Sequence, residues 1–167
     1  MITSDYCRQM ARYNMWQNDQ IHRALQDLTV DQLTQDRGVF FGSILGTVNH
    51  LLWGDLTWMS RLDGGPGPGD PVQGGTVLTA DGAAWWAARQ DADARIRDWA
   101  TGLSDGDLQG SLHWYSSMLQ QSYARPRAEC VLHMFNHQTH HRGQVHAMIT
   151  GLGRSAPVSD LVLMPPP

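Results

Sequence analysis

Five of the eight histidines in this sequence lie within fourteen residues, between His133 and His146. Residues 128–150 contain no proline and only one glycine, which predicts a helix. Residues four apart lie above one another on a helix, so His137 and His141 present their imidazoles to the same side. Because imidazole is a common ligand of Zn²⁺ and related divalent ions, this spacing predicts two ligands of a metal site.

The helical wheel separates these histidines by their distance from the predicted core. His137 and His141 lie at the edge of the apolar arc, His133 and His140 lie further round toward solvent, and His146 lies on the far side. Ligands beside packed apolar residues are held in place and shielded from water, which favours His137 and His141. A third ligand must come from another element, since a catalytic zinc site typically has three protein ligands. The arc consists of Val131, Met134, Val145, Met148, Ile149 and Leu152.

Apolar residues at helical spacing predict three further helices, near residues 3–28, 43–62 and 79–102. Together with the histidine-rich helix they favour an all-α four-helix bundle, with residues 1–167 forming a single domain. The loop at 63–80 is rich in glycine and proline, and its length allows a crossover between the second and third helices. Residues 103–127 are expected to hold short extended pieces.

Polar side chains interrupt several of the predicted core faces. Asp55 lies inside the apolar arc of the second helix, where it needs an arginine or a histidine N–H as partner. Asn14 and Asn18 interrupt the stripe of the first helix, so they either reach a cavity or backbone, or form hydrogen bonds to another helix. Arg89 and Asp93 are expected on the solvated side of the third helix.

His50 is the only histidine in the second helix, and it lies outside the apolar arc. This position is typical of a surface or hydrogen-bonded histidine. Its neighbours Thr47, Gly54 and Thr57 are small and leave room for a cavity, so spacing alone leaves a ligand role open.

Composition excludes several classes of function. All twelve basic residues are arginine and the net charge is −4, which excludes Schiff-base catalysis and a P-loop lysine and gives no basic patch for nucleic acid. No apolar run approaches the length of about 20 residues that a membrane span needs, and no signal pattern opens the sequence. We therefore expect a cytoplasmic protein, with Cys7 and Cys130 as free buried thiols rather than a disulfide.

Three segments form motifs: ARYNMWQN at 11–18, FGSILGTVNHLL at 41–52, and FNHQTHHRGQV at 135–145. With these segments the chain resembles the DinB-like (damage-inducible) family of bacterial four-helix-bundle metalloproteins. The resemblance covers essentially the whole chain and is most specific in the last helix. Similar members often carry histidine where Leu45 stands; that position is not counted as a ligand, but it changes the polarity near the site.

The resemblance implies that His50, His137 and His141 bind one divalent ion, and that the protein forms homodimers. Three neutral imidazoles suit Zn²⁺ or Ni²⁺ and also accept Fe²⁺, Co²⁺ or Mn²⁺, and affinity order alone does not choose among them. By helical position only, Asp55 and His140 are candidates for a catalytic general base.

Three functions are compatible with such a site. A metal-dependent hydrolase would cleave an ester or amide bond of an unknown small substrate with an acidified water. The alternative is an S-transferase or isomerase that uses a low-molecular-weight thiol, as relatives of the family do. A non-catalytic metal- or ligand-binding stress protein is the third. A reactive site predicts an open coordination position facing a cavity, whereas a structural site predicts a fourth ligand, His133 or His140.

Overall fold

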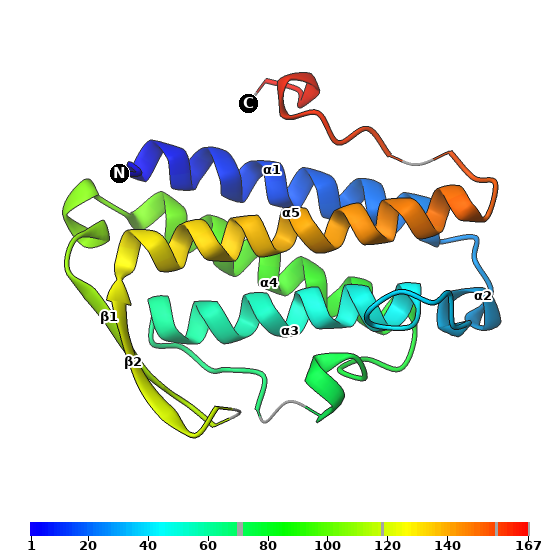
Figure 1. The fold of residues 1–167 in the computed structure, drawn as a ribbon. Coiled ribbons are helices and arrows are strands. Elements are labelled where there is room, and N and C mark those ends of the chain that lie inside the picture. Colours follow the sequence, from blue (N-terminus) through cyan, green and yellow to red (C-terminus); the bar gives the residue numbers. More distant parts are fainter. Residues whose placement is uncertain (70–71, 118, 156, 167) are drawn as a thin grey trace.

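Four long helices form a bundle in the computed structural model of the protein, which describes residues 1–69, 72–117, 119–155 and 157–166 (Figure 1). The predicted four-helix bundle is confirmed, and a small β-hairpin is added to it. The long helices are α1 (Ser4–Leu25), α3 (Ile44–Leu62), α4 (Gly82–Gly102) and α5 (Arg127–Gly151).

Three of the long helices begin after a polar side chain that caps their first turn. Thr3, Ser43 and Asp81 each accept a hydrogen bond from a backbone N–H three residues further on, at the starts of α1, α3 and α4. The fourth, α5, begins directly after Pro126, which closes the hairpin. These local signals place the helix starts close to the predicted ones.

The order of the helices around the bundle differs from their order along the chain. Both α1 and α3 pack against α4 and α5, so α1 and α3 lie diagonally opposite each other. Figure 1 shows α3 and α4 running in the same direction, so the chain must return along the bundle between them. This confirms the predicted crossover. The returning segment contains the 3₁₀ helix η1 (Val72–Gly75), and the connection from α1 to α3 contains the short helix α2 (Val30–Thr34).

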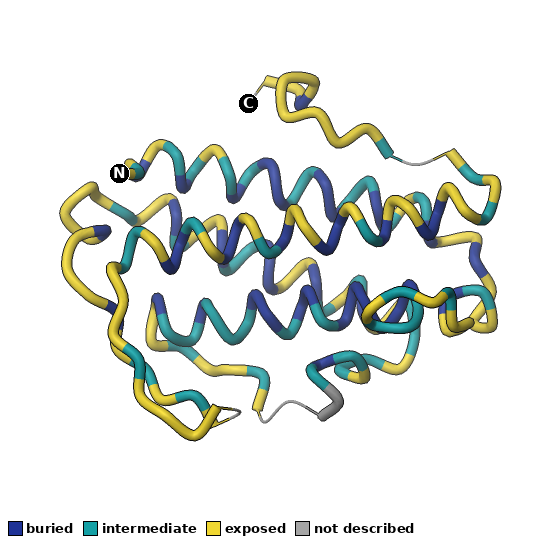
Figure 2. The backbone as a smooth tube through the Cα atoms, in the orientation of Figure 1, coloured by how far each residue is buried: buried dark blue, intermediate teal, exposed yellow. Residues whose placement is uncertain are grey.

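The segment between α4 and α5 forms an antiparallel hairpin of β1 (Ser111–Ser116) and β2 (Gln121–Pro126), after a 3₁₀ turn η2 (Asp105–Leu108). Trp114 and Tyr123 face each other across the two strands, with their ring centroids 5.3 Å apart. The hairpin is mostly exposed in Figure 2, but it lies against α3 and α5 and extends the side of the bundle that those two helices form.

Figure 2 shows that the buried residues lie on the inward sides of the long helices. Two apolar clusters fill the bundle, one toward each end, and buried polar residues lie between them. Arg89 and Asp93 belong to this polar layer and are only 1% and 3% exposed. The prediction that they lie on the solvated side of α4 is therefore wrong. Polar groups on α1 and α3 supply partners for them, which a wheel of α4 alone does not show.

The C-terminal tail and the two cysteines complete the fold. The tail lies along α1, where Tyr13 donates a hydrogen bond to the Ser159 carbonyl at 2.5 Å, and then forms a 3₁₀ turn η3 (Leu161–Leu163). Cys7 and Cys130 are free and buried, as predicted. Among the helices that the structure describes, none combines the length and apolar character needed to cross a membrane.

Candidate metal centre

The structure brings together the three histidines that the family resemblance indicated. His50 comes from α3, while His137 and His141 come from successive turns of α5, which packs beside α3. One nitrogen from each ring lies within 4.8 Å of the other two, and the Nε2 atoms of His50 and His137 are 3.0 Å apart. This is a cluster of the size that a single ion requires.

The orientation of His50 is set by the crossover loop and by an aromatic ring. Its Nδ1 lies 2.6 Å from the carbonyl oxygen of Gly74. A carbonyl only accepts, so Nδ1 must carry the hydrogen, and the Nε2 of the neutral ring then presents a lone pair to the cluster. Phe41 stacks on the His50 ring with centroids 3.8 Å apart and restricts its rotation.

His137 is pressed against α3 at a glycine. A Cβ at position 54 would meet the His137 Cε1 at 2.9 Å, so the absence of a side chain at Gly54 makes room for the ring. The Nδ1 of His137 is buried and has no hydrogen-bond partner among the described residues. Burial, with smaller contributions from the other histidines, lowers the pKa of His137 to about 3, so the ring is neutral at pH 7.

His141 is buried, and its Nδ1 lies 2.7 Å from the side-chain oxygen of Gln144, one turn further along α5. The same logic as for His50 places the hydrogen on Nδ1 and leaves Nε2 as the donor atom. Burial lowers the pKa of both His141 and His50, so all three rings favour the neutral, metal-binding form.

These donors fit a divalent ion. The Nε2 atoms of His50 and His137 lie 3.0 Å apart, close enough for both to bind one ion. Within the described part of the chain, the group of potential ligands contains these three histidines and no fourth residue. His133 and His140, the predicted candidates for a closed site, do not belong to it.

The other histidines of α5 have different surroundings. His133 is exposed and packs edge-to-face on Trp58, with centroids 5.0 Å apart. His140 is exposed, lies 4.7 Å from the His141 ring, and makes only a long contact of 3.5 Å with Gln144. His140 lies beside the cluster, and its catalytic role stays a prediction. His146 is exposed, as the wheel indicated.

Asp55 has the arginine partner that its position in the apolar arc required, and this partner lies inside the bundle. Arg89 donates to one carboxylate oxygen at 2.6 Å, and Gln138 donates to the other at 2.7 Å. Asp55 is 1% exposed, and among the described residues it makes no hydrogen bond to the three histidines. Both carboxylate oxygens of Asp55 are therefore engaged inside the bundle, and its role as a general base stays a prediction.

The Asp55–Arg89 pair is part of a buried network that links all four long helices. Arg89 also pairs with Asp93 at 3.0 Å, and Asp93 accepts hydrogen bonds from Asn14 and Asn18 of α1. This confirms the interpretation that the two asparagines bond to another helix. Arg142 of α5 donates to Asn14 and completes the network. The sequence feature that points to this network is Asp55 within the apolar arc of its helix, because a buried carboxylate requires a buried cation.

A cavity of about 690 Å³ opens beside His50 and His137. Its walls come from α3, α5, the hairpin and the crossover loop, so the bundle alone does not form it. Aromatic side chains dominate the lining, and one cation, Arg61, lies within it. The aromatic residues are Trp53, Trp58, Trp114, Tyr115 and Tyr123.

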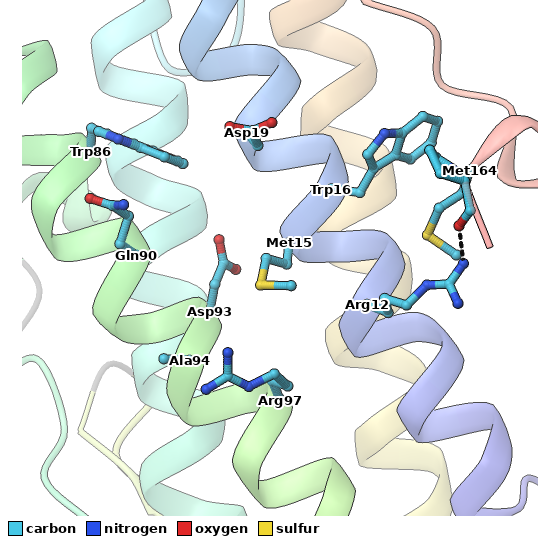
Figure 3. A pocket seen from close by; sticks show the side chains of 11 residues that line it. Arg12, Met15, Trp16, Asp19, Trp86, Gln90, Asp93, Ala94, Arg97 and Met164 are labelled. Atoms are coloured by element: carbon cyan, nitrogen blue, oxygen red, sulfur yellow. Dashed lines mark hydrogen bonds between the residues drawn. The ribbon is translucent and has the colours of Figure 1, made fainter. Parts of the chain in front are cut away.

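A second cavity, of about 500 Å³, lies between α1 and α4 (Figure 3). Trp16 and Trp86 line it, and Arg12 reaches across to donate to the Pro165 carbonyl of the tail at 2.5 Å. None of the three clustered histidines contributes to its lining. The chemistry predicted for the histidines therefore belongs to the cavity on the α3–α5 side.

Known proteins resemble this chain over nearly its full length. Protein DinB of Bacillus subtilis (strain 168) is 25% identical over 173 residues, which cover 94% of this chain and 92% of that protein. Bacillus subtilis YfiT, described as a probable metal-dependent hydrolase with an unusual four-helix bundle topology, superposes with a TM-score of 0.66 at 15% identity, over 93% of this chain and 92% of YfiT. A DinB-like protein from Bacillus cereus ATCC 10987 gives a TM-score of 0.59 at 16% identity, over 86% and 90% of the two chains. At these identities the two structures establish the fold alone.

The sequence model of the DinB family matches residues 1–166, and the chain belongs to the DinB family.

Proposed function

We propose that this protein binds one divalent metal ion through His50, His137 and His141 and acts as a metal-dependent hydrolase on a small molecule. The observation that carries the proposal is the convergence of three neutral imidazoles, with the Nδ1 of His50 and of His141 each engaged by a neighbouring oxygen. Zn²⁺ and Ni²⁺ suit such a donor set best, and Fe²⁺, Co²⁺ and Mn²⁺ are also compatible.

Hydrolysis is favoured by the position of the cluster at the cavity wall. A divalent ion held at such a site lowers the pKa of water and polarises a carbonyl group. The chain's own residues would orient the site: Gly74 and Gln144 hold two of the rings, and Phe41 restricts the rotation of His50. His140 is exposed beside His141 but does not line the cavity, so its role as a general base stays a proposal.

The likeness to YfiT supports hydrolysis by analogy of fold, which is a weaker argument than the site itself. A low-molecular-weight thiol could also bind to an ion held by only three protein ligands, so thiol transfer stays a prediction, as does non-catalytic metal binding. The homodimer and the small-molecule substrate also stay predictions.

The test is the metal content of tag-free protein purified without added metal, measured by elemental analysis. We expect near one equivalent per chain in the wild type and a loss in His141→Ala. His146→Ala is the matched control, because it removes an exposed histidine of the same helix and should keep the metal. Unchanged metal content in His141→Ala would refute the site. With the metal identified, ester, amide and thiol-transfer substrates separate the three functions.

A further inference from the structure

Arg61 is the cation of the cavity beside the histidine cluster. It lies near the C-terminal end of α3, half-buried, with its guanidinium against two indole rings that meet edge to face. The guanidinium carbon is 4.6 Å from the centroid of Trp58 and 5.1 Å from that of Trp114. These cation–π contacts restrict the position of the guanidinium without a hydrogen bond.

The N–H groups at the edge of the Arg61 guanidinium have no hydrogen-bond acceptor or carboxylate partner among the described residues. The other buried arginines contrast with it: Arg89 is paired with two carboxylates, and Arg142 donates to Asn14. Five N–H donors in a fixed fork match a planar carboxylate, which can accept two of them at once.

The cavity has no negative charge of its own. Its described lining contains Arg61 and three histidines but no aspartate or glutamate. A divalent ion on the three histidines would add further positive charge. A ligand that fills this cavity is therefore favoured when it is an anion.

The ligand's shape follows from what lies between the two ends of the cavity. Gly54, which contacts His137, and Arg61 are seven residues apart on α3, which corresponds to about 10 Å along the helix axis. Trp58 projects between them, and Trp114 and Tyr123 of the hairpin stack on the same side. Aromatic walls of this kind favour an apolar or aromatic body.

We propose that the cavity binds a small carboxylate with an apolar or aromatic body, with its carboxylate on Arg61 and its reacting bond at the histidine cluster. This assignment rests on the proposed metal-dependent function and specifies its substrate class. A singly charged carboxylate is favoured over a phosphate, because Arg61 is the only arginine in the described lining and lies at the C-terminal, negative end of the α3 dipole. Arg61 is thus a specificity-determining residue.

The experiment compares 3-phenylpropionate with its uncharged amide, 3-phenylpropanamide, by calorimetric titration of zinc-loaded protein. We expect the wild type to prefer the carboxylate by about ten-fold, as for a charge-assisted bidentate hydrogen bond. Arg61→Met keeps an unbranched apolar stem against the two tryptophans and should lose this preference, whereas Arg61→Lys should keep part of it. Arg23→Met is the matched control, because its side chain is 71% exposed and lies on α1.

Each outcome bears on the assignment. Equal affinity for the two probes, no binding of either, or an unchanged preference in Arg61→Met would overturn it. A preference that disappears in His141→Ala and persists in Arg61→Met would place the carboxylate on the metal and overturn the role of Arg61. Displacement of the probe by equimolar inorganic phosphate, measured on metal-free protein, would overturn the choice of carboxylate. Metal content is measured on the same samples. If no metal is bound and the preference for the carboxylate still depends on Arg61, the proposed metal-dependent function is refuted and the anion site is supported.

Discussion

The His137 imidazole lies against the backbone of Gly54, and a Cβ there would come within 2.9 Å of the ring. Gly54→Ala is therefore expected to displace His137 and to weaken metal binding by at least about ten-fold, because metal ligation depends on orientation. Alanine is also about 1 kcal/mol more favourable than glycine inside a helix, so the metal-free protein should lose little stability. Metal titration and urea unfolding of the same variant measure the two effects.

Gly143→Ala is the control for this substitution. Gly143 is an exposed glycine of α5, and its Cβ would meet nothing within 4 Å. It should gain helix stability and keep its metal affinity. If Gly54→Ala binds metal as tightly as Gly143→Ala does, the contact with His137 does not set the geometry of the site.

Removing the metal should lower the thermal stability. A ligand that binds only the folded state at a concentration 100 times its Kd stabilises it by about 2.7 kcal/mol, which corresponds to about 5–10 °C in a protein of this size. We expect a chelator to lower the Tm of the wild type by this amount and to leave His141→Ala unchanged. An equal effect of the chelator on both proteins would show that the ion binds elsewhere.

Arg89 compensates two buried carboxylates, so its loss should be costly. Arg89→Met leaves Asp55 and Asp93 without their cation, and we expect a loss of about 3–5 kcal/mol in the free energy of unfolding. Arg95→Met removes the partly exposed pair with Asp63 and should cost less than about 1 kcal/mol. Urea unfolding compares the two; similar losses would contradict the buried network.

Asp55→Asn separates a stabilising role from a role at the metal. Because both carboxylate oxygens of Asp55 point to Arg89 and Gln138, we expect lower stability with unchanged metal content. Metal analysis and urea unfolding of the purified variant test this. A loss of metal at full stability would instead link Asp55 directly to the site.

The Asp63–Arg95 pair should make stability depend on pH in the acid range. Arg95 donates two hydrogen bonds to Asp63 and one to the Pro66 carbonyl, and so fixes the start of the crossover loop. The hydrogen bonds from Arg95 hold the pKa of Asp63 below its usual range. A carboxylate whose pKa is lower in the folded state stabilises the protein above its unfolded pKa of about 3.9, and this contribution is lost as the pH falls through the folded value.

The stability difference between the wild type and Asp63→Asn should therefore be constant above about pH 5 and should shrink below it. Chemical unfolding at a series of pH values measures it. Asp98→Asn, which removes the charge of a side chain that is 70% exposed, is the control. A difference that does not change down to pH 3 would exclude the ion pair as its source.

The last helix could be predicted from the sequence in almost every respect that concerns the site. The period of 3.6 residues fixes which side chains share a face, so the pairing of His137 with His141 follows from spacing alone, as does the exposure of His146. Apolar residues at helical spacing and the glycine- and proline-rich loop likewise predicted the bundle and its crossover. These are local properties, and they do not depend on which helix packs against which.

The third histidine of the cluster and the buried network depended on the tertiary structure. His50 lies outside the apolar arc of its own helix, and only the packing of α3 on α5, with Gly54 making room for His137, brings its ring to the cluster. Family resemblance indicated it, while spacing did not. Arg89 and Asp93 were placed in solvent because a wheel describes one helix, whereas their burial is compensated by Asp55, Asn14 and Asn18 on two others.

The sequence by itself determined the helices, the crossover and two of the three imidazoles, because each follows from local periodicity and composition. Only the tertiary structure decided which polar groups face one another, and it joined the hairpin to α3 and α5 so that Trp114 stacks on Arg61 in the cavity. The physical reason is that the cost of burying a charge is set by partners on other elements, and these partners are known only when the chain has folded.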